Sequence, residues 1–120
     1  MTVLLIALGA ALGAPLRYLT DRAVQARHDS RFPWGTLTVN VAGSLLLGAV
    51  VGAPVGPAVT ALVGTGFCGA LTTWSTFGYE TVRLARTDAR RQAVANALAS
   101  VVAGLGAASL GFALARALTG

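Results

Sequence analysis

Charged residues are scarce in this sequence, and their scarcity excludes an ordinary soluble domain. Only 11% of the 120 residues are charged, 55% are hydrophobic, and the mean hydropathy is +0.71. No charged residue occurs in three stretches, 1–16, 32–79 and 92–115. Because a membrane-spanning helix needs about 20 mostly apolar residues, the composition predicts an integral membrane protein whose function lies inside the bilayer or at its surfaces.

Cysteine pairs and catalytic pairs are also missing. Cys68 is the single cysteine, which excludes an internal disulfide, and no second soft metal ligand lies near it in the sequence. No arrangement resembles a nucleophile with its base, and no pair of carboxylates lies within an apolar stretch. We therefore expect a protein that is not an enzyme and has no catalytic residues.

The apolar stretches predict four membrane spans. The middle stretch is too long for one helix and is interrupted at 52–57 by the sequence GAPVGP, which is a turn signal. The apolar N-terminal run lacks the basic segment of a signal peptide, so we interpret it as the first span. The prediction is one all-α membrane domain over 1–120, with helices near 3–19, 34–51, 58–79 and 93–118.

All nine basic residues are arginine, and eight of them gather in two predicted connectors, after the first and third spans. These eight residues are Arg17, Arg22, Arg27, Arg31, Arg83, Arg86, Arg90 and Arg91, whereas the opposite side carries only Arg116. Basic patches can bind nucleic acid, but these flank apolar spans within a few residues. We therefore expect no nucleic-acid partner, and the positive-inside rule places both connectors in the cytoplasm and both termini outside.

Hydroxyl side chains interrupt the third span. Thr72, Thr73, Ser75 and Thr76 follow Gly69 in an uncharged stretch, where hydroxyls are costly unless they meet partners. We predict that the third helix is broken near Gly69. Trp74 and Phe77, three residues apart, share a helical face. A broken membrane helix with hydroxyls and two aromatic rings is typical of an ion-handling site.

The residues alone leave two alternatives open for each of three features of this site. Asn40 offers amide donors in the second span, either to an anion pathway or to a bridge between two helices. Trp74 and Phe77 either present the positive edges of their rings to an anion or simply fill a core. Arg17 either draws anions into a vestibule or anchors the first helix at the membrane interface.

Three motifs, in the same order, resemble those of the small fluoride channels called Fluc or CrcB. They are GAPLRY at 13–18, PWGTLTVNVAG at 33–43 and GFCGALTTWSTF at 66–77. Chain length and the number of spans also fit, so the resemblance covers the whole sequence. It implies an antiparallel dimer of four-helix subunits in the cell membrane. Such a dimer has two narrow pores that export fluoride passively, and a structural sodium ion (Na⁺) at its two-fold axis.

The resemblance also implies roles for individual residues. It assigns the fluoride pore to Asn40, Trp74, Ser75, Thr76, Phe77 and Ser100, the vestibule to Arg17 and Glu80, and the sodium ligands to the backbone carbonyls of Gly69 and Thr72. Carbonyls of an unwound helix are free to bind a hard cation; a kink with hydroxyls bonded back to the i−4 carbonyl is the alternative. The sequence departs from the family at Trp74, where phenylalanine is usual.

The sequence also bears on two alternative functions and on the identity of the second subunit in the dimer. A small multidrug-type transporter has four helices too, but it needs a carboxylate within the membrane, and the first span has none. A non-conducting membrane assembly subunit is the other alternative. The uneven arginine distribution predicts one fixed orientation, so the antiparallel partner is expected to be an oppositely oriented homologue rather than a second copy.

Overall fold

The computed structural model describes residues 1–28 and 32–119, without the side chains of Trp74 and Ser75. Three of its helices are long and apolar enough to cross a membrane: α1 (Thr2–Ala26), α2 (Trp34–Gly52) and α6 (Arg90–Thr119). The proposed roles of the Trp74 and Ser75 side chains, and the placement of Arg31, lie outside the described residues.

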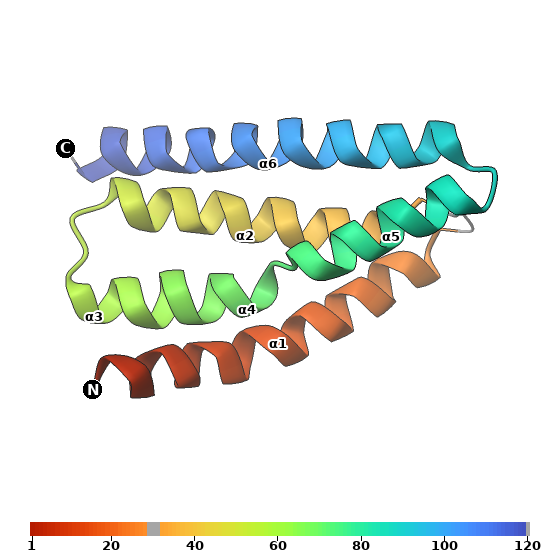
Figure 1. Cartoon of the computed structure of the whole chain (residues 1–120). Helices are drawn as coiled ribbons and strands as arrows, with labels where there is room; N and C mark the ends of the chain where they lie inside the picture. The colour runs from red at the N-terminus through yellow and green to blue at the C-terminus, as the bar shows by residue number, and fades with distance from the viewer. Residues whose placement is uncertain (29–31, 120) are drawn as a thin grey trace.

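The third helical segment is divided into two parts. Its first part contains α3 (Pro57–Val59), the π-helix η1 (Thr60–Cys68) and α4 (Gly69–Leu71), and its second part is α5 (Trp74–Arg86). The described residues therefore form an all-α fold of four helical segments with a broken third segment, as predicted. The segments run alternately up and down, so that both termini lie at one end with the 53–56 turn, and both arginine-rich connectors lie at the other (Figure 1).

Helix α1 extends well beyond the span predicted for it. Hydropathy placed its end near Leu19, whereas the helix continues to Ala26. The additional turns contain Asp21 and Arg22, which are polar but compatible with helix, and the Arg22 guanidinium donates to the Tyr18 hydroxyl over 3.0 Å. Hydropathy marks only the apolar part of a helix, while backbone hydrogen bonding continues into the polar part. For the same reason α5 continues to Arg86.

The break in the third segment lies later than predicted. Gly69 has helical backbone angles (φ −61°, ψ −37°), and the chain instead becomes extended at Thr72 and Thr73, with ψ values of 156° and 119°. The Thr73 hydroxyl caps α5 by accepting a 3.1 Å hydrogen bond from the Thr76 N–H. A capping threonine, and not a flexible glycine, therefore marks the break.

Glycines bring the helix backbones into direct contact. A Cβ atom built on Gly9 would overlap the Leu62 carbonyl oxygen, and one built on Gly48 would overlap that of Ala108. Helix α1 therefore packs closely on η1, and α2 packs closely on α6, as small residues allow in membranes. Figure 1 shows α2 between α6 and the third segment. A Cβ atom built on Gly43 of α2 would likewise overlap the Thr72 side chain, so α2 also lies against the unwound residues of the third segment.

Candidate functional site

A central cavity of about 450 Å³ lies beside the break. Residues of α2, α5, α6 and the unwound segment line it, and their polar members are Asn40, Ser44, Thr72, Thr73 and Ser100. Phe77, which is 8% exposed, contributes its ring from α5. The cavity therefore brings together four residues that the sequence singled out from three different spans, Asn40, Thr72, Phe77 and Ser100.

Asn40 holds the unwound segment by a pair of hydrogen bonds. Its Nδ2 donates to the Thr73 carbonyl oxygen over 3.2 Å, and its Oδ1 accepts from the Thr73 N–H over 2.8 Å. Asn40 is thus a bridge between two helical segments, and it also lines the central cavity. An amide nitrogen carries two hydrogens, so one donor remains beyond the bond to Thr73. The two roles left open by the sequence are compatible at this residue.

Hydrogen bonds at the break also engage the two N–H groups that would bond to the Gly69 and Thr72 carbonyls in a regular helix. In a continuous helix the Gly69 carbonyl accepts from the Thr73 N–H, and the Thr72 carbonyl accepts from the Thr76 N–H. Here the first N–H bonds to Asn40 and the second bonds to the Thr73 hydroxyl. The Thr72 hydroxyl also donates back to the Cys68 carbonyl over 2.9 Å. Both carbonyls implied as cation ligands are therefore deprived of their regular helical donors.

A chain of polar side chains leads from the central cavity between α5 and α6. The Ser100 hydroxyl donates to Asn96 Oδ1 over 3.3 Å, and Asn96 Nδ2 donates to the Thr81 hydroxyl over 2.8 Å. Thr81 in turn donates to the Phe77 carbonyl oxygen over 2.8 Å. Asn96 is only 1% exposed, so these bonds are needed to bury its amide. Sequence analysis missed Thr81, although its position four residues after Phe77 places both on one face of α5.

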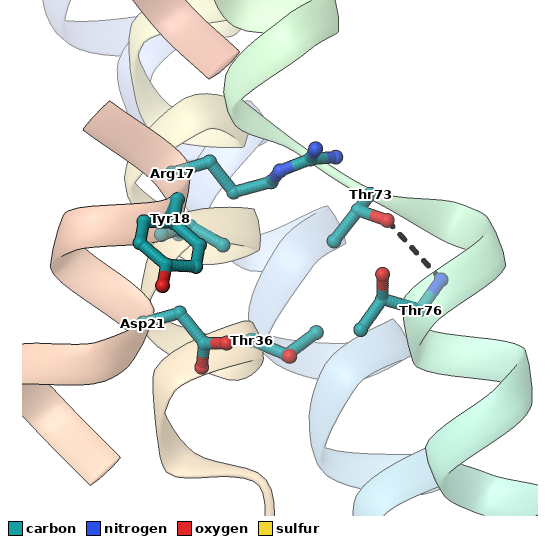
Figure 2. A pocket seen from close by; sticks show the side chains of 7 residues that line it. Arg17, Tyr18, Asp21, Thr36, Thr73 and Thr76 are labelled. Carbon is teal, nitrogen blue, oxygen red and sulfur yellow. Dashed lines mark hydrogen bonds between the residues drawn. The ribbon is translucent and has the colours of Figure 1, made fainter. Parts of the chain in front are cut away.

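A second, smaller cavity of about 170 Å³ lies between α1, α2 and the start of α5. Figure 2 shows Arg17 reaching from α1 toward the unwound segment, with Thr36 and Asp21 further along the cavity wall. Thr73 and Thr76 line this cavity too, and Thr73 also lines the central one. The two cavities therefore lie on either side of a shared residue, Thr73, at the break. Arg17, which the resemblance assigned to a vestibule, lines this smaller cavity, and its role there stays a prediction.

Glu80 is held by a residue that the sequence did not indicate. The Thr36 hydroxyl, which is 2% exposed and lies in the first turn of α2, donates to Glu80 Oε1 over 2.5 Å. Glu80 is half-buried and does not line either cavity described above. Its carboxylate is therefore fixed next to the vestibule by Thr36. The sequence did contain a signal for Thr36, because a polar threonine within the first turn of an apolar helix is expected to have a partner.

The fold and these cavities define a small multi-pass helical membrane protein built around an unwound segment, an arrangement that membrane proteins use for ion sites. Comparison with known proteins agrees with this description of the fold. Residues 4–112 match the family described as "CrcB-like protein, Camphor Resistance (CrcB)". The chain belongs to this CrcB family, which confirms the resemblance carried by its three motifs.

Relatives within the family cover nearly the whole chain. The protein named "Fluoride-specific ion channel FluC 1" of Frankia casuarinae is 61% identical, with all of both chains aligned. The protein of the same name in Streptomyces avermitilis is 57% identical over 98% of each chain. "Fluoride-specific ion channel FluC 2" of Rhodococcus jostii is 54% identical, covering 95% of this chain and 98% of the relative.

Proposed function

We propose that this protein is a fluoride-selective channel that lets fluoride leave the cell passively across the cell membrane and so lowers cytoplasmic fluoride. The observation that carries the proposal is that two cavities, each with polar side chains in its wall, share Thr73 at the break held by Asn40. The names of the close relatives support the choice of ion. Fluoride is small and strongly hydrated, so a dry path must replace its water with hydrogen-bond donors.

The donors proposed for this path come from both cavities. Asn40 and Ser100 line the central cavity, and Thr76 lines the vestibule with Arg17, whose charge attracts anions. Phe77 presents an aromatic ring, whose edge is positive. Glu80 borders the vestibule through Thr36. Trp74 and Ser75 enter the proposal from the family motif alone.

The active form in this proposal is an antiparallel dimer with a sodium ion at its two-fold axis. The carbonyls of Gly69 and Thr72 fit the role of ligands, because their helical donors are diverted and a hard cation prefers oxygen ligands. Apart from its chain neighbours and the backbone of its own helix, no described atom lies within 4 Å of a Cβ built on Gly69. Two carbonyls from each subunit supply four oxygens around the axis, and the ion would hold the two breaks together.

Anion flux from liposomes tests this function directly. Vesicles containing the protein, with any partner it requires, are expected to release fluoride and retain chloride, because a constriction sized for fluoride excludes the larger ion. A fluoride-selective electrode and a chloride electrode record the two effluxes, with protein-free vesicles as the control. Equal efflux of both ions would reject selectivity. No efflux of either ion would favour the non-conducting assembly subunit, and coupling of transport to protons would favour a multidrug-type transporter.

The orientation of the chain is the second testable part of the proposal. Eight of the nine arginines follow the first or third predicted span in the sequence, or seven if Arg17 is counted with α1, whereas only Arg116 lies near the C-terminus. We expect the termini to lie outside the cell in nearly every copy, so the antiparallel partner is a second, oppositely oriented homologue. Reporters fused to the C-terminus measure this when the chain is expressed alone. Similar cytoplasmic and external signals would instead indicate a dual-topology homodimer.

A further inference from the structure

Four arginines surround the corner where α5 ends and α6 begins. Arg83 and Arg86 lie in the last turn of α5, and Arg90 and Arg91 lie in the first turn of α6. All four are exposed. We call this group the arginine corner. It lies at the opposite end of the molecule from the two termini (Figure 1), and neither cavity at the break includes any of its members.

The turn that carries the arginine corner is well ordered. The Thr87 N–H donates to the Arg83 carbonyl over 3.1 Å, and the Ala89 N–H donates to the Leu84 carbonyl over 3.0 Å. Leu84, Ala89 and Ala93 form a buried cluster beneath it. Packing therefore fixes the last turn of α5 against the first turn of α6, and the backbones that carry the four guanidinium groups cannot move apart.

The charges of the arginine corner are poorly balanced within the chain. The first turn of α6 contains Arg90 and Arg91 and no acidic residue, although the N-terminal end of a helix favours negative charge. Asp88 is the one carboxylate in the turn itself. Among the described residues, Arg86, Arg90 and Arg91 form no ion pair. A fixed group of cations at a helix N-terminus attracts an anion from outside the chain.

One face of α5 shows which anion would fit. Tyr79, Val82, Arg83 and Arg86 are spaced i, i+3, i+4 and i+7, so they share this face. Tyr79 is 68% exposed and Val82 is 53% exposed. The face is apolar toward the break and cationic at its end. Exposed apolar side chains in a membrane protein meet acyl chains, tyrosine is favoured at the interface, and arginine lies at the depth of the phosphates.

We propose that the arginine corner is a binding site for the headgroup of an anionic phospholipid. Guanidinium groups from α5 and α6 bind the phosphate, for which their planar, bidentate geometry is suited. An acyl chain of the same lipid lies along Val82 and Tyr79. This apolar contact favours a lipid over free phosphate, because a soluble anion makes no use of it.

Lipid titration of the detergent-purified, intact assembly tests the site. Native mass spectrometry measures the binding of dioleoyl phosphatidylglycerol, with dioleoyl phosphatidylcholine as the neutral comparison. The double substitution Arg86→Gln/Arg90→Gln is expected to weaken phosphatidylglycerol binding by at least about tenfold, since it removes charge-assisted hydrogen bonds to the phosphate that arginines outside the site do not make. Lysine at both positions is expected to restore part of the affinity, and fluoride flux is expected to stay at the level of the parent protein.

The matched control is Arg22→Gln/Arg27→Gln, which removes the same charge from the other arginine-rich segment at the same end of the molecule. The proposal expects less than a twofold loss there. An equal loss in both pairs would show diffuse attraction and no site. Unchanged binding in Arg86→Gln/Arg90→Gln would also overturn the proposal. If soluble glycerol phosphate displaced the lipid at a similar concentration, the ligand of the site would be a free anion and not a lipid, and the proposal would be wrong.

Discussion

Replacing Asn40 by leucine is expected to reduce fluoride flux by about a hundredfold while the protein still inserts into the membrane. Asn40 makes both side-chain hydrogen bonds to the Thr73 backbone. Without them, the Thr73 N–H either stays unsatisfied, at a cost of about 1–3 kcal/mol, or returns to the Gly69 carbonyl and extends the helix. Either change alters the break, and the pathway also loses an amide donor.

A matched set of variants separates these effects in the same liposome assay. Asn40→Asp keeps an acceptor for the Thr73 N–H but removes the donor and adds a negative charge, so it should also lose flux. Thr38→Val is the control on α2, because the exposed Thr38 hydroxyl bonds only to the Trp34 carbonyl of its own helix. Its flux should match that of the parent. Parental flux in Asn40→Leu would show that neither the bridge nor the donor is required.

The same variant tests the sodium proposal independently of flux. The parent assembly is expected to unfold at a higher temperature in sodium than in a large organic cation, because bound sodium stabilises the folded dimer. In Asn40→Leu this difference should shrink, since the Thr73 N–H becomes available to the Gly69 carbonyl. Thermal unfolding in detergent measures it. A parent protein that is equally stable in both cations would contradict a structural role for sodium.

Substituting Gly48 is expected to have a large effect on stability. A Cβ atom at this position would overlap the Ala108 carbonyl on α6, and backbone atoms cannot move aside as a side chain does. Gly48→Ala should therefore destabilise the bundle by about 3 kcal/mol, the upper part of the range for overpacked cores. The yield of monodisperse protein and its unfolding temperature in detergent measure this effect.

Gly106→Ala is the matched control for Gly48→Ala. Beyond its own helix backbone and chain neighbours, no described atom lies within 4 Å of a Cβ built on Gly106, and alanine is favoured over glycine within a helix by about 1 kcal/mol. This variant should be as stable as the parent or slightly more so. Equal destabilisation by both substitutions would show that the effect comes from the substitution itself and not from contact between α2 and α6.

The polar contacts between segments show where sequence reasoning stops. Asn96 and Ser100 are four residues apart, a spacing that places both on one face of a single helix whatever surrounds it. Their partner Thr81 on α5 was not recognised, and neither was Thr36, which holds Glu80 from 44 positions away. Many hydroxyls occur in these spans, and spacing alone does not say which of them face a given side chain.

The sequence by itself determined the class of protein, the four spans and the end that carries the arginines. Hydropathy and charge act on each segment separately through its transfer between water and lipid, so they can be read without knowing how the segments pack. The family motifs added the residues of the break. None of these inferences required a contact between distant residues.

Only the tertiary structure decided where the third segment unwinds and what surrounds that point. The chain stays helical through Gly69 and opens at Thr72 and Thr73, because Asn40, 33 positions away, bonds to the Thr73 backbone. That bond exists only in the folded bundle, where α2 lies against the unwound residues. Several neighbouring residues have a local preference for ending the helix. The long-range hydrogen bond from Asn40 determines at which of them the helix ends.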